Sequence, residues 1–199
     1  MKSIRWFAVM CGIALLAPTG SCADPSPKLE PGGKAPTFTL SDINGAEHSL
    51  KDFLGSKYVV IMFIATQCPV SNAYNERMEQ LEKDYTSKGV TFVGINSNKQ
   101  ESMEEVREHA KAHGFTFTVL KDPGNKVADA YDAQITPEIF LLDSQGILRY
   151  HGRIDDSRDV QDVTSRDLRT ALDALLARKD VPRTETKAFG CTIKRVAQL

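Results

Sequence analysis

The stretch that decides the fold is YVVIMFIATQCPVSNAYNER, residues 58–77. It begins with an unbroken apolar run, 58–65, turns at Thr66-Gln67 and continues from Cys68 with helical spacing. Such an apolar run is typical of a strand whose two faces are both covered. Cys68 would then stand at a helix N-terminus, where free N–H groups and the helix dipole favour the thiolate. The stretch therefore predicts a strand-turn-helix unit that carries a reactive thiol.

Length and composition indicate one substantial globular domain. The chain has 199 residues, of which 41% are hydrophobic and 26% charged, as in ordinary soluble proteins. The formal net charge is −1, from 25 basic and 26 acidic side chains. This balance gives no electrostatic reason to expect a nucleic-acid partner.

Residues 1–23 have the pattern of an export signal: two early basic residues, an apolar run and a small, breaker-rich end. The apolar run is too short to span a bilayer comfortably. Cleavage before Asp24 is one reading. Lipid attachment to Cys22 is another, because Gly20-Ser21-Cys22 resembles a lipobox, although Thr19 stands where a lipobox usually has Leu. An uncleaved anchor is the third. Both processed forms predict an exported domain, periplasmic or lipid-anchored facing the periplasm, with a membrane contact only through the lipid.

Four cysteines are present, and Cys11 and Cys22 belong to the signal segment. Cys68 and Cys191 are therefore the two thiols of the folded domain, and an oxidising compartment allows them to pair. Three further segments follow the signal. They are a Pro- and Gly-rich flexible linker at 24–34, a folded domain at 35–180, and a weakly patterned tail at 181–199 that carries Cys191.

The order of elements predicts an α/β fold. We expect a hairpin at 37–50 around Asn44-Gly45, strands at 58–65, 90–95 and 117–120, and a second hairpin at 139–151. Helices are expected after Cys68, at 101–113, at 127–131, and after a capping box at 164–167. A βαβ unit followed by a hairpin and a final helix indicates a three-layer α/β/α sandwich around a mixed sheet.

In these features the chain resembles the thioredoxin-like superfamily. The resemblance is greater to its redoxin branch, which contains peroxiredoxin-like (alkyl hydroperoxide reductase–thiol-specific antioxidant-like) and TlpA-like proteins. The resemblance covers roughly residues 33–178. The segments that carry it are 35–38 (APTF), 58–65, Cys68-Pro69, 135–138 (ITPE) and 142–146 (LDSQG). It implies a thioredoxin-like fold with an N-terminal β-hairpin. It also implies thiol chemistry that needs no cofactor, because cysteines hold the electrons.

Thr136-Pro137 is a second feature of this resemblance. In thioredoxin-like proteins a cis-proline packs against the active cysteine, and its backbone offers strand-like hydrogen bonds to a bound peptide. The resemblance implies that Pro137 is this substrate-facing residue, with Thr136 beside it. An ordinary trans proline is the alternative, since only about 5–6% of X-Pro bonds are cis. Glu138, the next residue, could assist proton transfer near Cys68 or be a plain exposed side chain.

The chain also departs from the family pattern. Ser71 stands where thioredoxins carry the second cysteine of Cys-x-x-Cys, and a serine cannot resolve a mixed disulfide. Peroxiredoxins have Thr or Ser three residues before the peroxidatic cysteine and Pro seven before it. Here those positions hold Ala65 and Ile61, which weakens the case for peroxide chemistry.

Cys191 leaves three interpretations open. It could be a resolving cysteine that forms a reversible disulfide with Cys68, a static clamp that pins the tail, or an independent thiol. Metal binding is not expected. His109 and His113 have helical i, i+4 spacing without further ligands around them, and copper-delivery relatives use a pair of cysteines where only Cys68 is present.

The combined expectation is an exported thiol-based oxidoreductase of the redoxin type. Cys68 would attack a protein disulfide or a small hydroperoxide, Cys191 would resolve the intermediate, and an external thiol reductant would reopen the disulfide. The alternative is a non-catalytic thioredoxin-fold binding module, in which the Pro137 face is a partner platform and the Cys68–Cys191 disulfide is structural or absent.

Overall fold

The computed structural model describes residues 28–197. The predicted signal peptide at 1–23, with the lipidation proposed for Cys22, and residues 24–27 of the predicted linker lie outside this range. None of the helices within 28–197 is long and apolar enough to cross a membrane.

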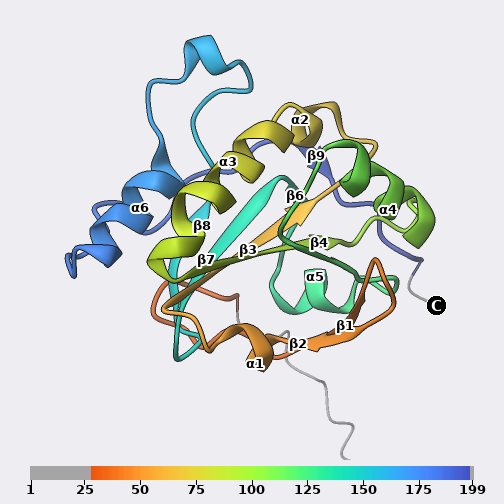
Figure 1. The fold of residues 1–199 in the computed structure, drawn as a ribbon, viewed down its shortest axis with the longest axis horizontal. Helices are drawn as coiled ribbons and strands as arrows, with labels where there is room; N and C mark the ends of the chain where they lie inside the picture. The colour runs from red at the N-terminus through yellow and green to blue at the C-terminus, as the bar shows by residue number, and fades with distance from the viewer. Residues whose placement is uncertain (1–27, 198–199) are drawn as a thin grey trace, which may run out of the picture.

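A seven-stranded mixed sheet forms the middle of the molecule, in the order β2-β1-β5-β4-β3-β7-β8 (Figure 1). The central strand β3 is parallel to β4 and antiparallel to β7. The strands are β1 (Thr39–Asp42), β2 (Glu47–Ser49), β3 (Tyr58–Ile64), β4 (Val90–Asn96), β5 (Thr118–Lys121), β7 (Glu138–Asp143) and β8 (Leu148–Gly152). A separate two-stranded sheet joins β6 (Ile135–Thr136) to β9 (Cys191–Thr192). The predicted mixed sheet is confirmed.

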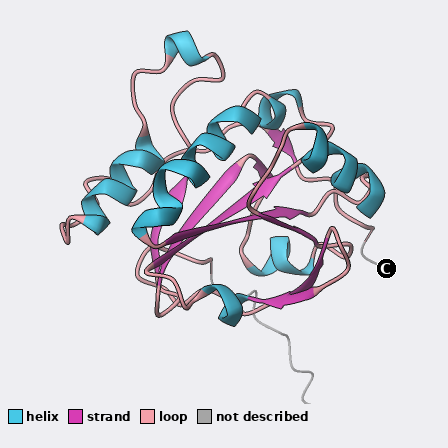
Figure 2. Ribbon diagram, viewed as in Figure 1, coloured by secondary structure: helices cyan, strands magenta, loops and turns pink. Residues whose placement is uncertain are grey.

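Helices lie on both sides of the sheet, as Figure 2 shows. The six helices in the described range are α1 (Leu50–Phe53), α2 (Pro69–Asn72), α3 (Asn75–Tyr85), α4 (Met103–Ala112), α5 (Lys126–Ala130) and α6 (Asp167–Leu176), with 3-10 turns η1 (Thr86–Lys88) and η2 (Val160–Asp162). Two buried clusters follow from this layering: one is built with α3, α4 and α6, and the other with α1 and α5. The three-layer α/β/α arrangement is therefore present.

Strand β3 divides these two clusters. Its even-numbered side chains Val60, Met62 and Ile64 belong to one cluster, and the odd-numbered Val59, Ile61 and Phe63 belong to the other. Because successive side chains of a strand point to opposite faces, a strand covered on both faces needs an unbroken apolar run. Residues 58–65 are such an apolar run, and β3 lies where the sequence predicts a strand.

Three details differ from the sequence-based expectations. The helix after Cys68 is split into α2 and α3 around Ala73-Tyr74. The final helix begins at Asp167 without a side-chain cap, because the Thr164 hydroxyl and backbone N–H both bond the Asp156 carboxylate instead. The described part of the 24–34 segment is packed rather than free: Leu29 is 7% exposed and Gly32 donates to the Leu148 carbonyl at 2.8 Å.

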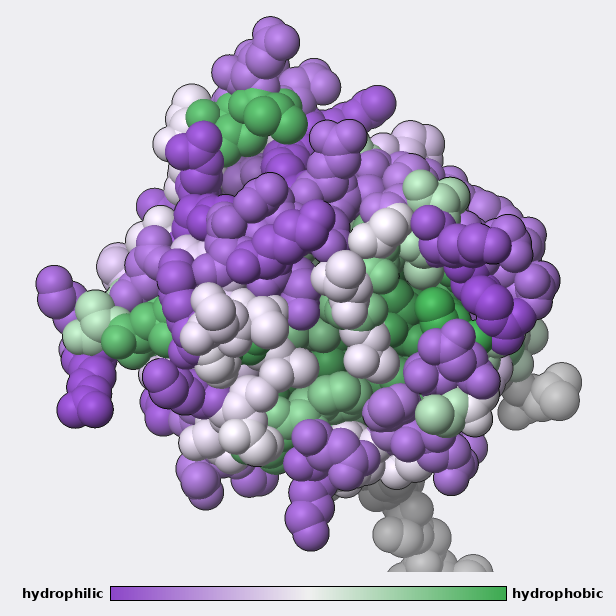
Figure 3. Space-filling view, in the orientation of Figure 1, coloured by the Kyte–Doolittle hydropathy of each residue, from purple (hydrophilic) through white to green (hydrophobic). Residues whose placement is uncertain are grey.

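A loop between β8 and α6, which contains η2, projects from the body of the molecule at the upper left (Figure 1). Figure 3 shows a hydrophobic patch on this loop between hydrophilic neighbours. Val160, in η2, is 63% exposed, the largest exposure among the large hydrophobic side chains noted in the described range. The start of the loop is packed, because Ile154 belongs to the cluster built with α3, α4 and α6, whereas η2 adds exposed surface to the domain.

Candidate active site

Cys68 lies where the end of β3 turns into α2. It is the N-cap of α2, is 3% exposed, and accepts a hydrogen bond on Sγ from the backbone N–H of Ser71 at 3.3 Å. Pro69 occupies the first helical position, where its missing N–H costs nothing. A backbone N–H that points at sulfur stabilises the thiolate over the thiol. The local geometry thus supports a nucleophilic Cys68.

Ser71, at the position of the second cysteine of Cys-x-x-Cys, has a structural contact instead of a thiol. Its side chain is fully buried, and its hydroxyl oxygen accepts the backbone N–H of Ala65 at 3.2 Å. The hydroxyl therefore ties the end of β3 to α2, while the Ser71 backbone, not its side chain, contacts the Cys68 sulfur.

The peptide bond between Thr136 and Pro137 is cis, the conformation that the resemblance implied. The carbonyl oxygen of Thr136 lies 3.4 Å from Sγ of Cys68. Ile135 and Thr136 form β6, which pairs antiparallel with β9, so that Thr136 is opposite Cys191. Figure 1 places β6 and β9 side by side below α2. Three segments far apart in sequence thus meet at one sulfur.

Cys68 and Cys191 form a disulfide. Their Cα atoms are 5.8 Å apart although 123 positions separate them in sequence. The bond removes the interpretation of two independent thiols and leaves a reversible redox pair or a static clamp. Gly190 makes the approach possible, because a Cβ atom on it would overlap the Thr136 carbonyl oxygen.

The segment that carries Cys191 is anchored at both ends, and we call residues 184–196 the C-terminal strap. Upstream, His151 donates its backbone N–H to the Thr184 carbonyl at 2.9 Å, and Thr186 donates back to the His151 carbonyl at 3.0 Å. Downstream, Ile193 is 3% exposed within a core cluster and donates to the Gln134 carbonyl at 2.9 Å. The predicted tail is therefore part of the packed domain.

Glu101 holds the turn that precedes Cys68, a role that the sequence did not reveal. Its carboxylate accepts the backbone N–H groups of Thr66 at 2.9 Å and Gln67 at 3.0 Å. The side chains of Asn96 and Asn98 also donate to it. Burial raises the pKa of Glu101, but these hydrogen bonds outweigh it and hold the pKa below the ordinary value of 4.5. Glu101 is therefore a buried carboxylate that stays ionised.

Asn98 connects this turn to the strap. Its side-chain amide donates to Glu101 at 2.9 Å, and its side-chain oxygen accepts the backbone N–H of Lys194 at 2.7 Å. Lys194 in turn accepts on its carbonyl oxygen from the Lys99 backbone N–H at 2.9 Å. One hydrogen-bonded path, Gln67–Glu101–Asn98–Lys194, thus links the neighbour of Cys68 to a strap residue close to Cys191.

Glu138 is buried and bonded to the loop that precedes Pro137. It is 5% exposed, and its carboxylate accepts the backbone N–H groups of Gln134 at 2.7 Å and Ile135 at 3.2 Å. Its other oxygen lies 2.8 Å from Nε2 of His151, whose Nδ1 is 3.4 Å from Glu185 of the strap. The exposed side chain considered for Glu138 is therefore wrong, and these bonds shape the loop before Pro137. A role of Glu138 in proton transfer stays a prediction.

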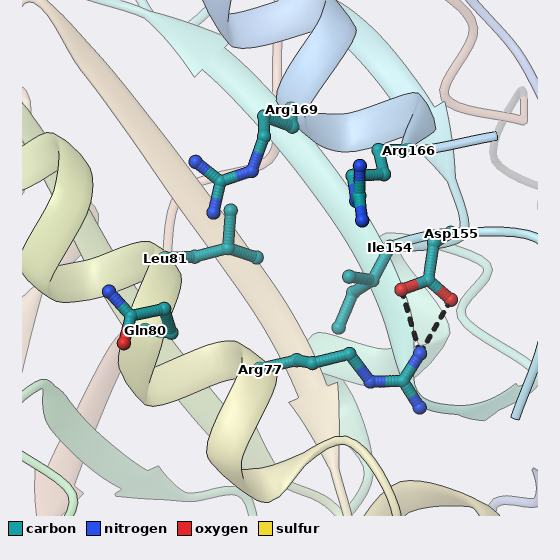
Figure 4. A pocket seen from close by; sticks show the side chains of 7 residues that line it. All are labelled: Arg77, Gln80, Leu81, Ile154, Asp155, Arg166 and Arg169. Carbon is teal, nitrogen blue, oxygen red and sulfur yellow. Dashed lines mark hydrogen bonds and ion pairs between the residues drawn. The ribbon is translucent and has the colours of Figure 1, made fainter. Parts of the chain in front are cut away.

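A pocket of about 80 Å³ lies between α3 and α6, and neither cysteine lines it (Figure 4). Three arginines border it, but Arg77 makes two hydrogen bonds to Asp155, at 2.8 and 2.7 Å. Tyr74, immediately before α3, also donates its hydroxyl to Asp155 at 2.8 Å. The buried ion pair therefore fixes the start of α3, and hence the helical unit headed by Cys68, against the loop after β8.

Comparison with known proteins identifies the family of the chain. A family model described as the AhpC/TSA family matches residues 31–151. The chain belongs to the AhpC/TSA family. The match includes Cys68, Thr136 and Pro137 and ends before Cys191, so the strap is outside the shared region.

Relatives of this AhpC/TSA protein include a thioredoxin-like protein and a thiol-disulfide oxidoreductase. The thioredoxin-like protein YneN of Bacillus subtilis is 30% identical over 151 residues, which cover 73% of this chain and 87% of that protein. The thiol-disulfide oxidoreductase ResA of Bacillus subtilis is 35% identical over 115 residues, 58% of this chain and 63% of that protein. The protein is an oxidoreductase of the redoxin type, peroxiredoxin-like in family and similar to thiol-disulfide oxidoreductases.

Among solved structures, the hypothetical protein SMc02350 from Sinorhizobium meliloti is similar over nearly the whole molecule. The TM-score is 0.81 at 38% identity, and the match covers 86% of this chain and 97% of the other. Because the family model ends at residue 151, this longer match extends the likeness beyond the residues that define the AhpC/TSA family.

Proposed function

We propose that this protein is an exported thiol oxidoreductase in which Cys68 is the nucleophile and Cys191 the resolving cysteine. The observation that carries the proposal is the disulfide between a cysteine at a helix N-cap and a cysteine anchored opposite Thr136. Both sulfurs are thus positioned for exchange without a large movement of the chain. Residues 35–180 form the redoxin domain in this proposal, and the tail at 181–199 supplies Cys191.

The reaction follows thiol-disulfide chemistry. The Cys68 thiolate attacks one sulfur of a substrate disulfide and releases the other sulfur as a thiolate, which leaves a mixed disulfide on Cys68. The Cys191 thiolate then attacks Sγ of Cys68, expels the second substrate thiolate and forms Cys68–Cys191. Two thiolates of an external reductant reopen this bond in two exchange steps. With a hydroperoxide, Cys68 takes the distal oxygen as a sulfenic acid and an alcohol leaves. Cys191 then displaces hydroxide, which is protonated to water.

The deciding experiment compares Cys68→Ser and Cys191→Ser with the unmodified protein in reduction of glutathione disulfide. We expect Cys68→Ser to lose about a thousandfold or more of the rate. Cys191→Ser should retain the first attack and accumulate a mixed disulfide on Cys68, visible by mass spectrometry. A Cys68 thiol pKa below the free value of about 8.5 should accompany this reactivity.

The second candidate is a non-catalytic binding module in which the disulfide is a clamp. The double anchoring of the strap favours this function, because it gives the bond a structural role. In that case both serine variants would lose stability, and the unmodified protein would reduce disulfides no faster than a free thiol. The two outcomes cannot be confused, because only the enzyme yields a trapped intermediate on Cys68.

Export rests on residues 1–23, with a lipid on Cys22 as the anchored form. Expression of the full chain in a bacterium, followed by fractionation and fatty-acid labelling, tests both forms. We expect the domain outside the cytoplasm. Label that disappears in Cys22→Ala identifies the lipoprotein. An unlabelled, cleaved chain in the soluble periplasmic fraction identifies the soluble form, and an unlabelled, uncleaved chain in the membrane fraction identifies the anchor. Retention of the unprocessed chain in the cytoplasm would contradict export.

A further inference from the structure

The edge of strand β6, beside the sulfur of Cys68, is already paired with another strand. β6 has two residues, and its strand partner is β9 of the same chain, with Ile135 opposite Thr192 and Thr136 opposite Cys191. An extended polypeptide is usually bound by adding a strand to such an edge, where backbone hydrogen bonds provide affinity. Here the strap takes that place, and the Gly190 backbone lies directly against the Thr136 carbonyl.

The strap has anchors besides the disulfide. Besides the bonds at Thr184, Thr186 and Ile193, Val196 donates its backbone N–H to the Asn125 side-chain oxygen at 2.7 Å. Arg195 donates to Asp129 at 2.7 Å. These contacts lie on both sides of Cys191 and involve neither sulfur. These anchors should therefore keep β9 on β6 when the bond is reduced.

Access to Cys68 is correspondingly narrow. In the disulfide-bonded form Cys68 is 3% exposed, and the exposed neighbours around it are Gln67 and Pro69 on its own segment and Gly190 and Thr192 on the strap. A small molecule needs to bring only one reactive atom between these neighbours. A disulfide within an extended polypeptide must bring its flanking backbone as well, and the strap already fills the edge along which that backbone would lie.

We propose that the strap is a substrate filter that admits low-molecular-weight oxidants to Cys68 and excludes disulfides carried by extended polypeptides. The proposal rests on the proposed function of Cys68 as a nucleophile. The shared chemistry of the admitted substrates is a small, electrophilic two-electron oxidant, either a disulfide sulfur or a peroxide oxygen. The external thiol that later reopens Cys68–Cys191 can attack the sulfur of Cys191, which is partly exposed.

The test compares two disulfides of similar reactivity and different size. Glutathione disulfide is the small probe, and the disulfide-linked dimer of an extended peptide of about ten residues with one central cysteine is the large probe. Both are added to the reduced protein in a Cys191→Ser background, so that mixed disulfide on Cys68 is the readout by mass spectrometry. Hydrogen peroxide is the third probe, and sulfenic acid on Cys68 is its product. Comparison of its reaction rate with that of glutathione disulfide identifies which small oxidant reacts faster with Cys68.

We expect the small disulfide to react at least about tenfold faster than the peptide dimer. Gly190→Ala places a methyl group on the Thr136 carbonyl, should lift the strap from β6, and should raise the peptide rate about tenfold with little change for the small probe. Gly55→Ala is the matched control, because its added methyl group meets no atom within 4 Å. If Gly190→Ala does not fold, Ile193→Asp, which removes the downstream anchor, replaces it.

Equal rates for both disulfides, or no gain for the peptide in a folded variant with a released strap, would overturn the filter while leaving Cys68 as the nucleophile. Failure of Cys68 to react with any of the three oxidants faster than a free thiol would overturn the proposed function itself, and the filter with it. The two failures are therefore distinguishable.

Discussion

Cys68 and Cys191 form one disulfide, yet the molecule positions them by different means. Cys68 follows the seven-residue strand β3 and heads a helical segment, so regular secondary structure determines where its sulfur lies. Cys191 belongs to a two-residue strand within an otherwise irregular strap. Its position depends on individual contacts, such as the buried side chain of Ile193 and the hydrogen bond from Lys194 to Asn98.

The difference shows how a redox site can be assembled on a local motif that holds a single cysteine. The turn before Cys68 and the strap both bond to the same buried polar group, formed by Glu101 and Asn98. Cys191 is therefore held close to Cys68 as firmly as a second cysteine of a local motif would be, although the two residues are more than a hundred positions apart in sequence. The predictions below test whether the strap holds its position independently of the disulfide.

Reduction should have the largest effect on stability. The bond joins residues separated by 123 positions. In the chain-entropy model a loop of this length corresponds to about 4–5 kcal/mol of unfolding free energy. We expect that loss in guanidinium unfolding of the reduced protein against the oxidised protein. Because the anchors of the strap do not involve sulfur, the Ile193 amide should stay protected from hydrogen exchange after reduction. Exchange of this amide at the rate of a free chain would mean that the disulfide alone holds the strap.

Truncation of Ile193 should have the next largest effect. Ile193→Ala removes a 3% exposed side chain from a core cluster and should cost about 2–4 kcal/mol. It should also slow closure of the Cys68–Cys191 bond, because Cys191 is two residues away. Val196→Ala is the control, since Val196 is 40% exposed and should change the unfolding free energy by less than about 0.5 kcal/mol. Equal costs for the two variants would show that Ile193 is not an anchor.

The same contrast explains what the sequence could predict. β3, the N-cap position of Cys68 and the Asn44-Gly45 hairpin are local patterns, and each lies where it was expected. Glu101 begins the segment 101–113 that the sequence predicts as a helix, and no local pattern distinguishes it from the other acidic residues there. Its role depends on Thr66 and Gln67, which only the folded β3-β4 pair brings near. The one sequence signal for such a role of Glu101 is the run of polar residues that directly follows the buried strand β4.

Neutralising Glu101 should have a moderate effect with a defined pH dependence. Glu101→Gln replaces an acceptor of two backbone N–H groups and should cost about 1–3 kcal/mol at neutral pH. The folded pKa of Glu101 is lowered from 4.5, so its contribution is present above that pH and is lost as pH falls through the folded value. The deficit of the variant should therefore shrink on acidification below about 4.5. Glu108→Gln, on the exposed face of α4, is the control, and a deficit that persists unchanged at low pH would contradict an ionised Glu101.

Asn98→Ala should have the smallest effect on stability and the most selective effect on chemistry. It breaks the link between the Cys68 turn and the strap and leaves both cysteines and Ile193 in place. We expect the free energy of unfolding to fall by about 1–2 kcal/mol, since two hydrogen bonds to a buried side chain are lost.

Closure of the disulfide from the mixed-disulfide intermediate should slow in Asn98→Ala, because the strap loses its register against the turn. The first attack by Cys68, measured in the Cys191→Ser background, should change less, since the Ser71 N–H contact to sulfur is independent of Asn98. Gln100→Ala, an exposed neighbour, should alter neither step. If Asn98→Ala slowed both steps equally, Asn98 would support the fold as a whole, and the accurate placement of Cys191 would have to come from the strap anchors alone.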